Sequence, residues 1–110
     1  MITIDSLREF GANVDTGLER CLNNQEFYIK MVNLALSDTR FEDLKAVLEQ
    51  KDYTKAFEMC HALKGTTGNV ALDPMYDILC QMTELLRTQT DTDYSQLYGQ
   101  LMELKGRLVG

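Results

Sequence analysis

Residues 60 to 68 read CHALKGTTG and contain the only histidine of the 110-residue chain. Histidine changes its charge near neutral pH, so a neutral imidazole is available there as a nucleophile. Lys64 follows His61 by three residues and Gly65 follows it by four, so on a helix both lie within about one turn of the ring. A phosphoryl group on a ring nitrogen is anionic, and a nearby ammonium favours it. This spacing therefore suggests an acceptor of a phosphoryl group.

The apolar face of the helix that carries the histidine indicates where the ring points. Seven residues are expected on that face: Tyr53, Ala56, Phe57, Cys60, Leu63, Thr67 and Val70. At about 100° per residue, His61 lies roughly 120° from the middle of the face, Lys64 at its edge and Gly65 opposite the core. A glycine on an exposed helix surface costs about 1 kcal/mol relative to alanine, and here it clears space beside the ring. A surface histidine next to an incidental glycine is the alternative, and spacing alone does not separate the two.

Metal binding is the other chemistry to consider for this stretch, because Cys60 precedes the histidine and Cys80 lies further along. Adjacent helical residues diverge by about 100°, so Cys60 and His61 do not converge on one ion. With Cys21, the chain has three cysteines and no close pair, which is typical of small buried apolar side chains in a reducing compartment. A single histidine without a Glu-x-x-His stretch excludes a di-iron bundle. We expect no metal and no cofactor in this chain.

The N-terminal half is expected to hold two short helices and one long helix. The first short helix spans 3–10, opened by Thr3 or Asp5, and the second lies around 14–22. A stripe at steps of three, four or seven then favours one long helix from Asn24 to Leu48, although Asp38 interrupts the stripe and is a candidate for a kink or a break. The stripe consists of Phe27, Met31, Leu34, Phe41, Leu44 and Leu48.

The C-terminal half is expected to hold three further helices. Asp52 is a candidate N-cap for the helix that carries the histidine. Pro74 suits the first turn of the next helix behind a cap formed by Asp73. Apolar faces at 75–86 and 94–108 define the last two helices, with a polar loop between them. The pattern predicts an all-α fold: an antiparallel four-helix bundle with one or two short N-terminal helices packed against it.

Composition narrows the class of protein. Hydrophobic residues make up 45% and charged residues 25%, as in globular domains, and the absence of a linker or repeat favours one domain over residues 1–110. A net charge of −6 with scattered basic residues argues against nucleic-acid binding. No apolar run approaches the roughly 18 residues that span a membrane, and the N-terminus does not resemble a signal peptide. We expect a cytoplasmic protein, free-standing since it begins with Met1.

The stretch HALKGTTGNVAL, from His61 to Leu72, resembles the signature of histidine-containing phosphotransfer (HPt) domains, in which H-x-L-K-G precedes small residues. The likeness extends over nearly the whole chain, including NQEFYIKMVNLAL and ILCQMTELLR. It implies that His61 is phosphorylated and that Lys64 steadies the phosphoryl group. It also implies that Gly65 gives a receiver domain access and that Gly68 allows close contact one turn further on.

The resemblance implies a phosphotransfer protein of a multistep two-component phosphorelay. The phosphoryl group would come from an aspartyl phosphate of one receiver domain and pass to another, and Mg²⁺ would belong to the receiver. The partners would be receiver domains of hybrid sensor kinases and response regulators. The chain has no P-loop or kinase motif, so we expect a monomeric carrier without ATP site or autokinase activity rather than an enzyme. A docking module that is never phosphorylated is the competing interpretation.

Two positions depart from the family pattern. Ala71 stands where the family often has glycine, which leaves the phosphorylation site intact. Thr83 falls near the position where many members have Glu or Gln to hydrogen-bond the site, so the resemblance does not supply that contact. Gln81 is the alternative residue for it.

Overall fold

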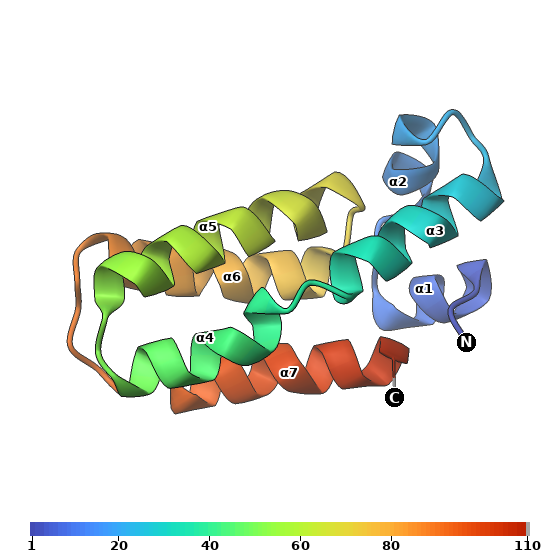
Figure 1. Ribbon diagram of the computed structural model, residues 1–110. Coiled ribbons are helices and arrows are strands. Elements are labelled where there is room, and N and C mark those ends of the chain that lie inside the picture. The colour runs from blue at the N-terminus through green and yellow to red at the C-terminus, as the bar shows by residue number, and fades with distance from the viewer. Residues whose placement is uncertain (110) are drawn as a thin grey trace.

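The computed structural model describes residues 1–109, which contain seven helices joined by short turns and loops (Figure 1). They are α1 (Ile4–Phe10), α2 (Val14–Arg20), α3 (Gln25–Leu36), α4 (Arg40–Glu49), α5 (Tyr53–Asn69), α6 (Asp73–Arg87) and α7 (Ser95–Val109). No strand occurs within these residues. The predicted all-α fold class is confirmed.

Helices α4 to α7 run alternately in opposite directions and form an antiparallel bundle (Figure 1). The closest packing is between α5 and α6, while α4 packs on α5 and α7 packs on α6. Helix α3 runs in the direction of α4 and contacts α5 near its C-terminal end. The short helices α1 and α2 lie at the end of the bundle where α7 finishes, and α1 contacts α7. The expected bundle with two short N-terminal helices is therefore present.

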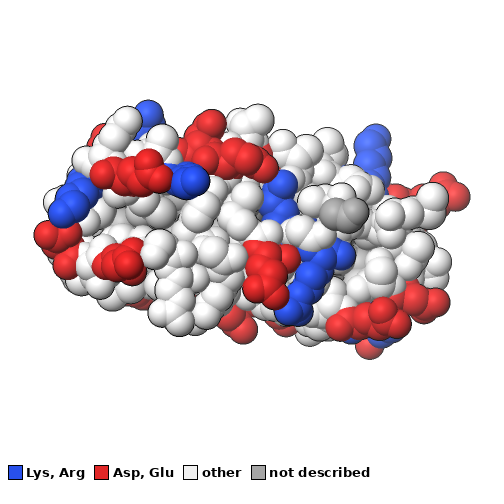
Figure 2. Space-filling model, turned by 90° about the horizontal axis from the view of Figure 1, so that it is seen from below, with Lys and Arg blue, Asp and Glu red and all other residues white. Residues whose placement is uncertain are grey.

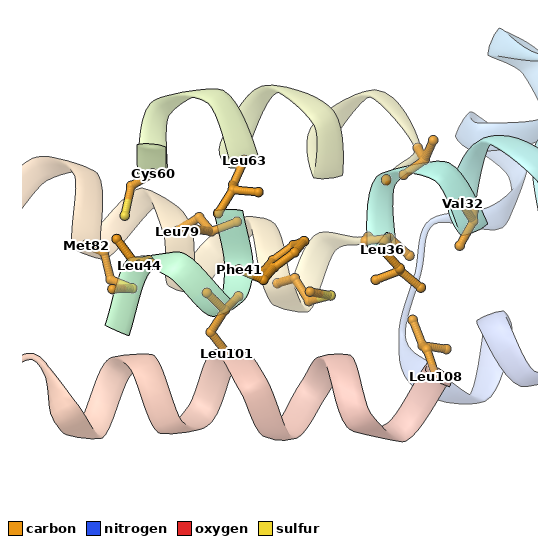
Figure 3. Close-up of a cluster of buried hydrophobic side chains, with 14 of the residues drawn as sticks. Val32, Leu36, Phe41, Leu44, Cys60, Leu63, Leu79, Met82, Leu101 and Leu108 are labelled. Carbon is orange, nitrogen blue, oxygen red and sulfur yellow. The ribbon is translucent and has the colours of Figure 1, made fainter. Parts of the chain in front are cut away.

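A continuous apolar core fills the space between the bundle helices (Figure 3). Fully buried side chains come from every bundle helix: Phe41, Leu44, Cys60, Leu63, Leu79, Met82 and Leu101. Those that share a helix are three residues apart and so lie on one face, which each helix turns inward. Two threonines are also fully buried, and each hydroxyl donates to the carbonyl one turn earlier, Thr67 to Leu63 at 2.9 Å and Thr83 to Leu79 at 2.6 Å. Their polar atoms therefore do not weaken the core.

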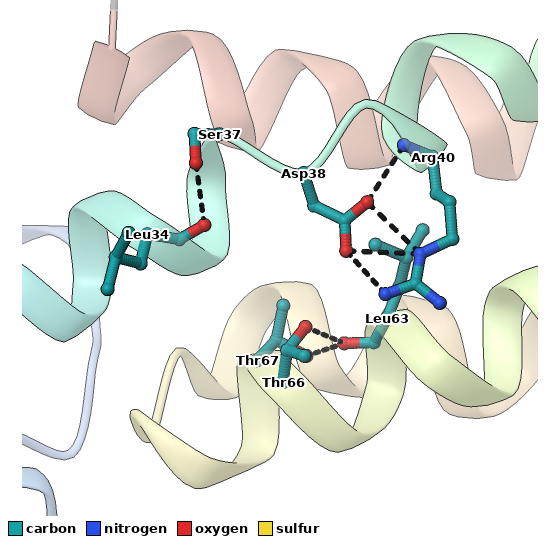
Figure 4. A network of polar contacts seen from close by, with 7 residues as sticks. All are labelled: Leu34, Ser37, Asp38, Arg40, Leu63, Thr66 and Thr67. Atoms are coloured by element: carbon teal, nitrogen blue, oxygen red, sulfur yellow. Dashed lines mark hydrogen bonds and ion pairs between the residues drawn. The ribbon is translucent and has the colours of Figure 1, made fainter.

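The prediction of one long helix from Asn24 to Leu48 is wrong, because the chain breaks between α3 and α4 (Figure 4). The Asp38 carboxylate accepts a hydrogen bond from the backbone N–H of Arg40 at 2.9 Å and pairs with its guanidinium at 2.8 Å. The Ser37 hydroxyl donates to the Leu34 carbonyl at 2.8 Å. These short polar side chains satisfy the backbone at the turn in place of helical hydrogen bonds. Asp38 is thus the break that the sequence offered only as an alternative.

The break also changes which residues of α3 face the core. The stripe read from the sequence places Phe27 and Leu34 inside, whereas their side chains are 44% and 54% exposed. The buried residues of α3 are Tyr28, Val32, Ala35 and Leu36. The predicted stripe assumes that one helix runs through both α3 and α4. Because the turn at Asp38 separates the two helices, the inward-facing positions of α3 cannot be counted from those of α4.

The N-terminal part of the chain is fixed by local caps and by long-range contacts. Thr3 caps α1 in a capping box, in which its hydroxyl accepts from the Ser6 N–H at 3.0 Å. Gly17 of α2 makes room for Tyr28, because a Cβ at Gly17 would overlap the tyrosine ring. The Tyr28 hydroxyl donates to the carbonyl of Val70 at 2.8 Å, just beyond α5. The α1–α2 pair is therefore tied to the end of the helix that carries the histidine.

The turn between α5 and α6 differs from the prediction in one respect. Leu72 occupies the N-cap position of α6 without a side-chain hydrogen bond, and Asp73 lies in the first turn, so the expected aspartate cap is wrong. Helix α5 ends in a Schellman motif, in which the N–H of Leu72 donates to the Thr67 carbonyl and the N–H of Ala71 donates to the Gly68 carbonyl. Ala71 has a φ of 58°, the left-handed region that favours glycine, at the position where the family often has glycine.

The face of the molecule seen from below carries both signs of charge. Figure 2 shows one face of the molecule, seen from below, with acidic and basic side chains interspersed rather than gathered in a basic stripe. One ion pair joins Lys105 of α7 to Glu42 of α4 at 3.0 Å. Within residues 1–109, no helix is both long enough and apolar enough to cross a membrane.

Candidate functional site

Helix α5 positions the candidate site, and its ends are well defined. The Asp52 carboxylate accepts from the Lys55 N–H at 3.2 Å and caps the first turn, as predicted. Between this cap and the Schellman motif, α5 runs for 17 residues. Cys60 and Leu63 are fully buried on its inner face, so the helix cannot rotate without exposing them. His61 consequently lies on the outer face and is exposed, as the helical geometry predicted.

The imidazole of His61 stacks on the ring of Phe57, one turn earlier on α5. The two ring centroids are 5.9 Å apart and the planes differ by 15°. Phe57 is half-buried and packs against the core, so its ring has a fixed base. The guanidinium carbon of Arg87, from α6, lies 5.1 Å from the centroid of the Phe57 ring. An aromatic side chain therefore supports the imidazole on its N-terminal side.

The opposite side of the imidazole is open. A Cβ built at Gly65 meets no atom within 4 Å, so nothing in the protein occupies the space one turn after His61. Lys64 is half-buried and forms no ion pair with a side-chain carboxylate of residues 1–109. No carboxylate of these residues therefore neutralises its ammonium, which can interact with an anion. Lys64 and Gly65 also line a surface hollow of about 460 Å³ together with Arg20 and Tyr76.

Gly68 has an internal contact that the sequence did not suggest. A Cβ at this position would lie 3.0 Å from two ring carbons of Tyr76 on α6, closer than side chains normally approach. The Arg20 guanidinium donates to the Gly68 carbonyl at 2.6 Å and approaches the Asn69 carbonyl at 3.4 Å. The cation sits at the C-terminal end of α5, where the helix dipole favours it. Gly68 thus serves the packing of α6 on α5, and its contact with a partner remains a prediction.

The structure places the two α6 residues considered for a hydrogen bond to the site, Thr83 in the core and Gln81 on the surface. Thr83 is fully buried and bonded to Leu79, so its hydroxyl is directed into the core and not to the imidazole. Gln81 is exposed on α6.

The cysteines are not gathered at the histidine as metal ligands. Cys60 is fully buried next to the exposed histidine, and burial raises the pKa of its thiol to about 12. All three cysteines are free thiols, and Cys80 is only half-buried. No group of three or more His, Cys, Asp and Glu side chains is gathered as a metal site anywhere in residues 1–109.

A family model described as the Hpt domain matches residues 32–108 of the chain. This chain belongs to the Hpt domain family. The matched region contains His61, Lys64, Gly65 and Gly68, and it covers α4 to α6 in full and nearly all of α7. Helices α1 and α2 and the first part of α3 lie outside it. Comparisons with curated proteins and with solved structures gave no match. Membership implies a role in phosphotransfer within phosphorelays and a helical module that interacts with receiver domains.

Sequence reasoning missed three residues around the Hpt histidine. Phe57 stands four residues before His61, a spacing that places the two side chains on one helix face, but it was assigned to the core. Arg87 and Arg20 reach the site region from α6 and α2. Nothing in their local sequence indicates this, because each contact depends on how separate helices pack.

Proposed function

We propose that this protein carries a phosphoryl group on His61, which it accepts from an aspartyl phosphate of one receiver domain and passes to another. The observation that carries the proposal is the position of the only histidine. In a chain of the Hpt domain family, the His61 ring is exposed and has open space toward Gly65. The partners would be receiver domains of hybrid sensor kinases and response regulators, met in the cytoplasm.

The transfer forms one bond and breaks one. The lone pair of a ring nitrogen of His61 attacks the phosphorus of the aspartyl phosphate, and a P–N bond forms. The bond between phosphorus and the aspartate oxygen breaks, and its electron pair stays on the carboxylate. The second transfer reverses this chemistry, with an aspartate of another receiver as the nucleophile. The nitrogen that attacks does so through its own lone pair, so no separate base has to remove a proton from it.

The other site residues have distinct roles in this proposal. Lys64 offers its ammonium to the phosphoryl oxygens, which strengthens the interaction with the charged product. Gly65 leaves the space through which the receiver reaches the ring, and Gly68 allows close approach one turn further on. Mg²⁺ and the acidic pocket come from the receiver. The protein is a carrier that binds no ATP and does not phosphorylate itself.

A second candidate is a docking module that binds a receiver but is not phosphorylated. Phe27 and Leu34 favour it, because these large apolar side chains are about half exposed on α3 and offer a surface for a partner. Such a module would bind a receiver equally well with and without the histidine side chain.

Transfer of radioactive phosphate from a phosphorylated receiver domain separates the two candidates. Wild-type protein is expected to acquire a label that is labile in acid and stable in alkali, as a phosphohistidine is. His61→Gln keeps a polar side chain of similar size at an exposed position and is expected to acquire none while still binding the receiver. Label that persists in His61→Gln would refute the site. No transfer from any of several receivers that bind the protein would favour the docking module.

A further inference from the structure

The surroundings of His61 differ on its two sides along α5. Toward the N-terminus, the residue one turn away is Phe57, whose ring stacks on the imidazole at 5.9 Å. Toward the C-terminus, the residue one turn away is Gly65, where the structure leaves open space. The imidazole therefore has one supported face and one accessible side.

Phe57 is itself held from two directions. Its inner edge packs against the apolar core, which limits how the side chain can turn. Arg87 of α6 lies over the ring, with its guanidinium carbon 5.1 Å from the centroid, and it pairs with Glu84 of the same helix at 3.3 Å. A guanidinium over an aromatic face is attractive in its own right. The phenyl ring is thus a fixed support rather than a mobile surface group.

From this geometry we propose that Phe57 is a positioning residue that holds the plane of the His61 imidazole for phosphoryl transfer. The inference rests on the function proposed above. An exposed histidine that lacked the stack would rotate among its side-chain rotamers, and only some of these direct a ring nitrogen into the open space beside Gly65. In-line attack on phosphorus requires such alignment, so a ring that is already aligned raises the transfer rate.

The stack acts on alignment and not on binding of the receiver. Phe57 does not contribute the nucleophile or a charge, and the open space at Gly65 remains when its ring is removed. Loss of the stack is therefore expected to slow the transfer step and to leave the affinity for the receiver unchanged. Aromatic pairs of this kind are modest in strength, so we expect a decrease of roughly three- to tenfold in the transfer rate.

The test compares Phe57→Leu with Phe57→Tyr and with Phe10→Leu in the full chain. Phe57→Leu keeps apolar bulk at the core but removes the stacking ring, and Phe57→Tyr keeps the ring. Phe10 is also half-buried and packs against the core, but it lies on α1, outside the site described above, so Phe10→Leu controls for lost stability. The transfer rate at saturating phosphorylated receiver and the dissociation constant of the unphosphorylated receiver are measured for each protein. Proton NMR of the His61 ring reports the stack directly, because the phenyl ring shifts these resonances upfield.

The expected result is a slower transfer in Phe57→Leu, near wild-type transfer in Phe57→Tyr and Phe10→Leu, and unchanged receiver affinity throughout. The upfield shift of the His61 resonances should disappear only in Phe57→Leu. Wild-type transfer by Phe57→Leu would overturn the inference while leaving the proposed function intact. An equal decrease in Phe57→Leu and Phe10→Leu would overturn it as well, since stability alone would then explain the loss. A wild-type protein that accepts no label from its receivers would refute the proposed function itself, and the positioning role with it.

Discussion

Gly65 shows why a single residue has to be interpreted together with its neighbours. Within residues 1–109, three glycines inside helices are positions at which an added Cβ meets nothing within 4 Å, namely Gly65, Gly99 and Gly106. An open glycine on a helix is therefore not by itself a sign of a site in this protein. What distinguishes Gly65 is its position four residues after the only histidine and directly after Lys64.

The three open glycines provide a matched test of access. Gly65→Gln fills the space beside the imidazole and is expected to slow transfer from a phosphorylated receiver by tenfold or more, because the side chain obstructs the partner. Glutamine is a better helix former than glycine, so the free energy of unfolding should rise by about 0.5–1 kcal/mol. Urea denaturation and transfer kinetics measure the two effects. Gly99→Gln should gain the same stability and transfer normally, and Gly65→Gln transferring at the wild-type rate would contradict the access role.

Among the site residues, helical geometry predicted burial well and side-chain contacts poorly. The outward position of His61 and the inward position of Cys60 follow from counting 100° per residue, and the structure agrees with both. The stack on Phe57 was missed because a half-buried aromatic can serve the core and the surface at once. The burial of Thr83 could not be predicted from its residue type, because a threonine hydroxyl can donate to a carbonyl of its own helix, here that of Leu79.

At the scale of the elements, sequence signals located helix starts better than helix ends. Thr3 and Asp52 cap their helices through side-chain oxygens, which are visible in the sequence. Several helices instead end at left-handed residues that are not glycine, including Lys51 at a φ of 57° and Gln89 at a φ of 52°. Such residues carry no sequence signal for a helix end. The turn at Asp38 differs, because its polar residue did mark a possible break, but the apolar stripe on both sides favoured one continuous helix.

Lys51 offers a way to stabilise the end of α4. Its N–H donates to the Leu48 carbonyl and the N–H of Asp52 donates to the Val47 carbonyl, which is the Schellman pattern with Lys51 in the left-handed position. Lys51→Gly removes the conformational cost of that position and is expected to raise the free energy of unfolding by about 0.5–1 kcal/mol. The ion pair lost with Asp91 is exposed and offsets little of this gain.

Gln50 is the control for this change, because it precedes Lys51, is also exposed and has a φ of −79°. Gln50→Gly gains nothing from left-handed freedom and should lower the free energy of unfolding, as glycine does elsewhere near a helix. Urea denaturation of both variants at one pH compares them. If Lys51→Gly were less stable than the wild type, the ion pair of Lys51 with Asp91 would contribute more to stability than the left-handed conformation of Lys51 costs.

At the scale of the whole molecule, the periodic apolar faces were sufficient to predict the bundle, but not how its N-terminal part attaches. The Hpt match begins at residue 32, so α1 and α2 lie outside the family region. Arg20 and Tyr28 nevertheless reach carbonyl groups at the end of α5, 48 and 42 residues away in sequence. Contacts of such separation depend on the packed arrangement, which is why no local pattern predicted them. Through them the N-terminal helices brace the end of the helix that bears the histidine.

Two buried titratable groups, the Cys60 thiol and the Tyr28 hydroxyl, predict how the stability of the molecule responds to alkali. Burial raises the pKa of the Cys60 thiol from 9.0 to about 12, and burial is also the main cause that raises the pKa of the Tyr28 hydroxyl from 10.0 to about 12. In both cases the folded state favours the neutral form, so the stabilisation is complete below the ordinary pKa and is lost as pH rises through the folded value. The free energy of unfolding should therefore fall between about pH 9 and pH 12, by up to about 1.4 kcal/mol per pH unit for each group. Urea denaturation under reducing conditions from pH 7 to pH 11 measures this slope.

Cys60→Ala tests the share of the thiol in this slope. Its free energy of unfolding should be lower than that of the wild type at pH 7, because the substitution leaves a small cavity, and should fall less steeply above pH 9. A decline in Cys60→Ala as steep as that of the wild type would show that the thiol does not contribute to alkaline unfolding.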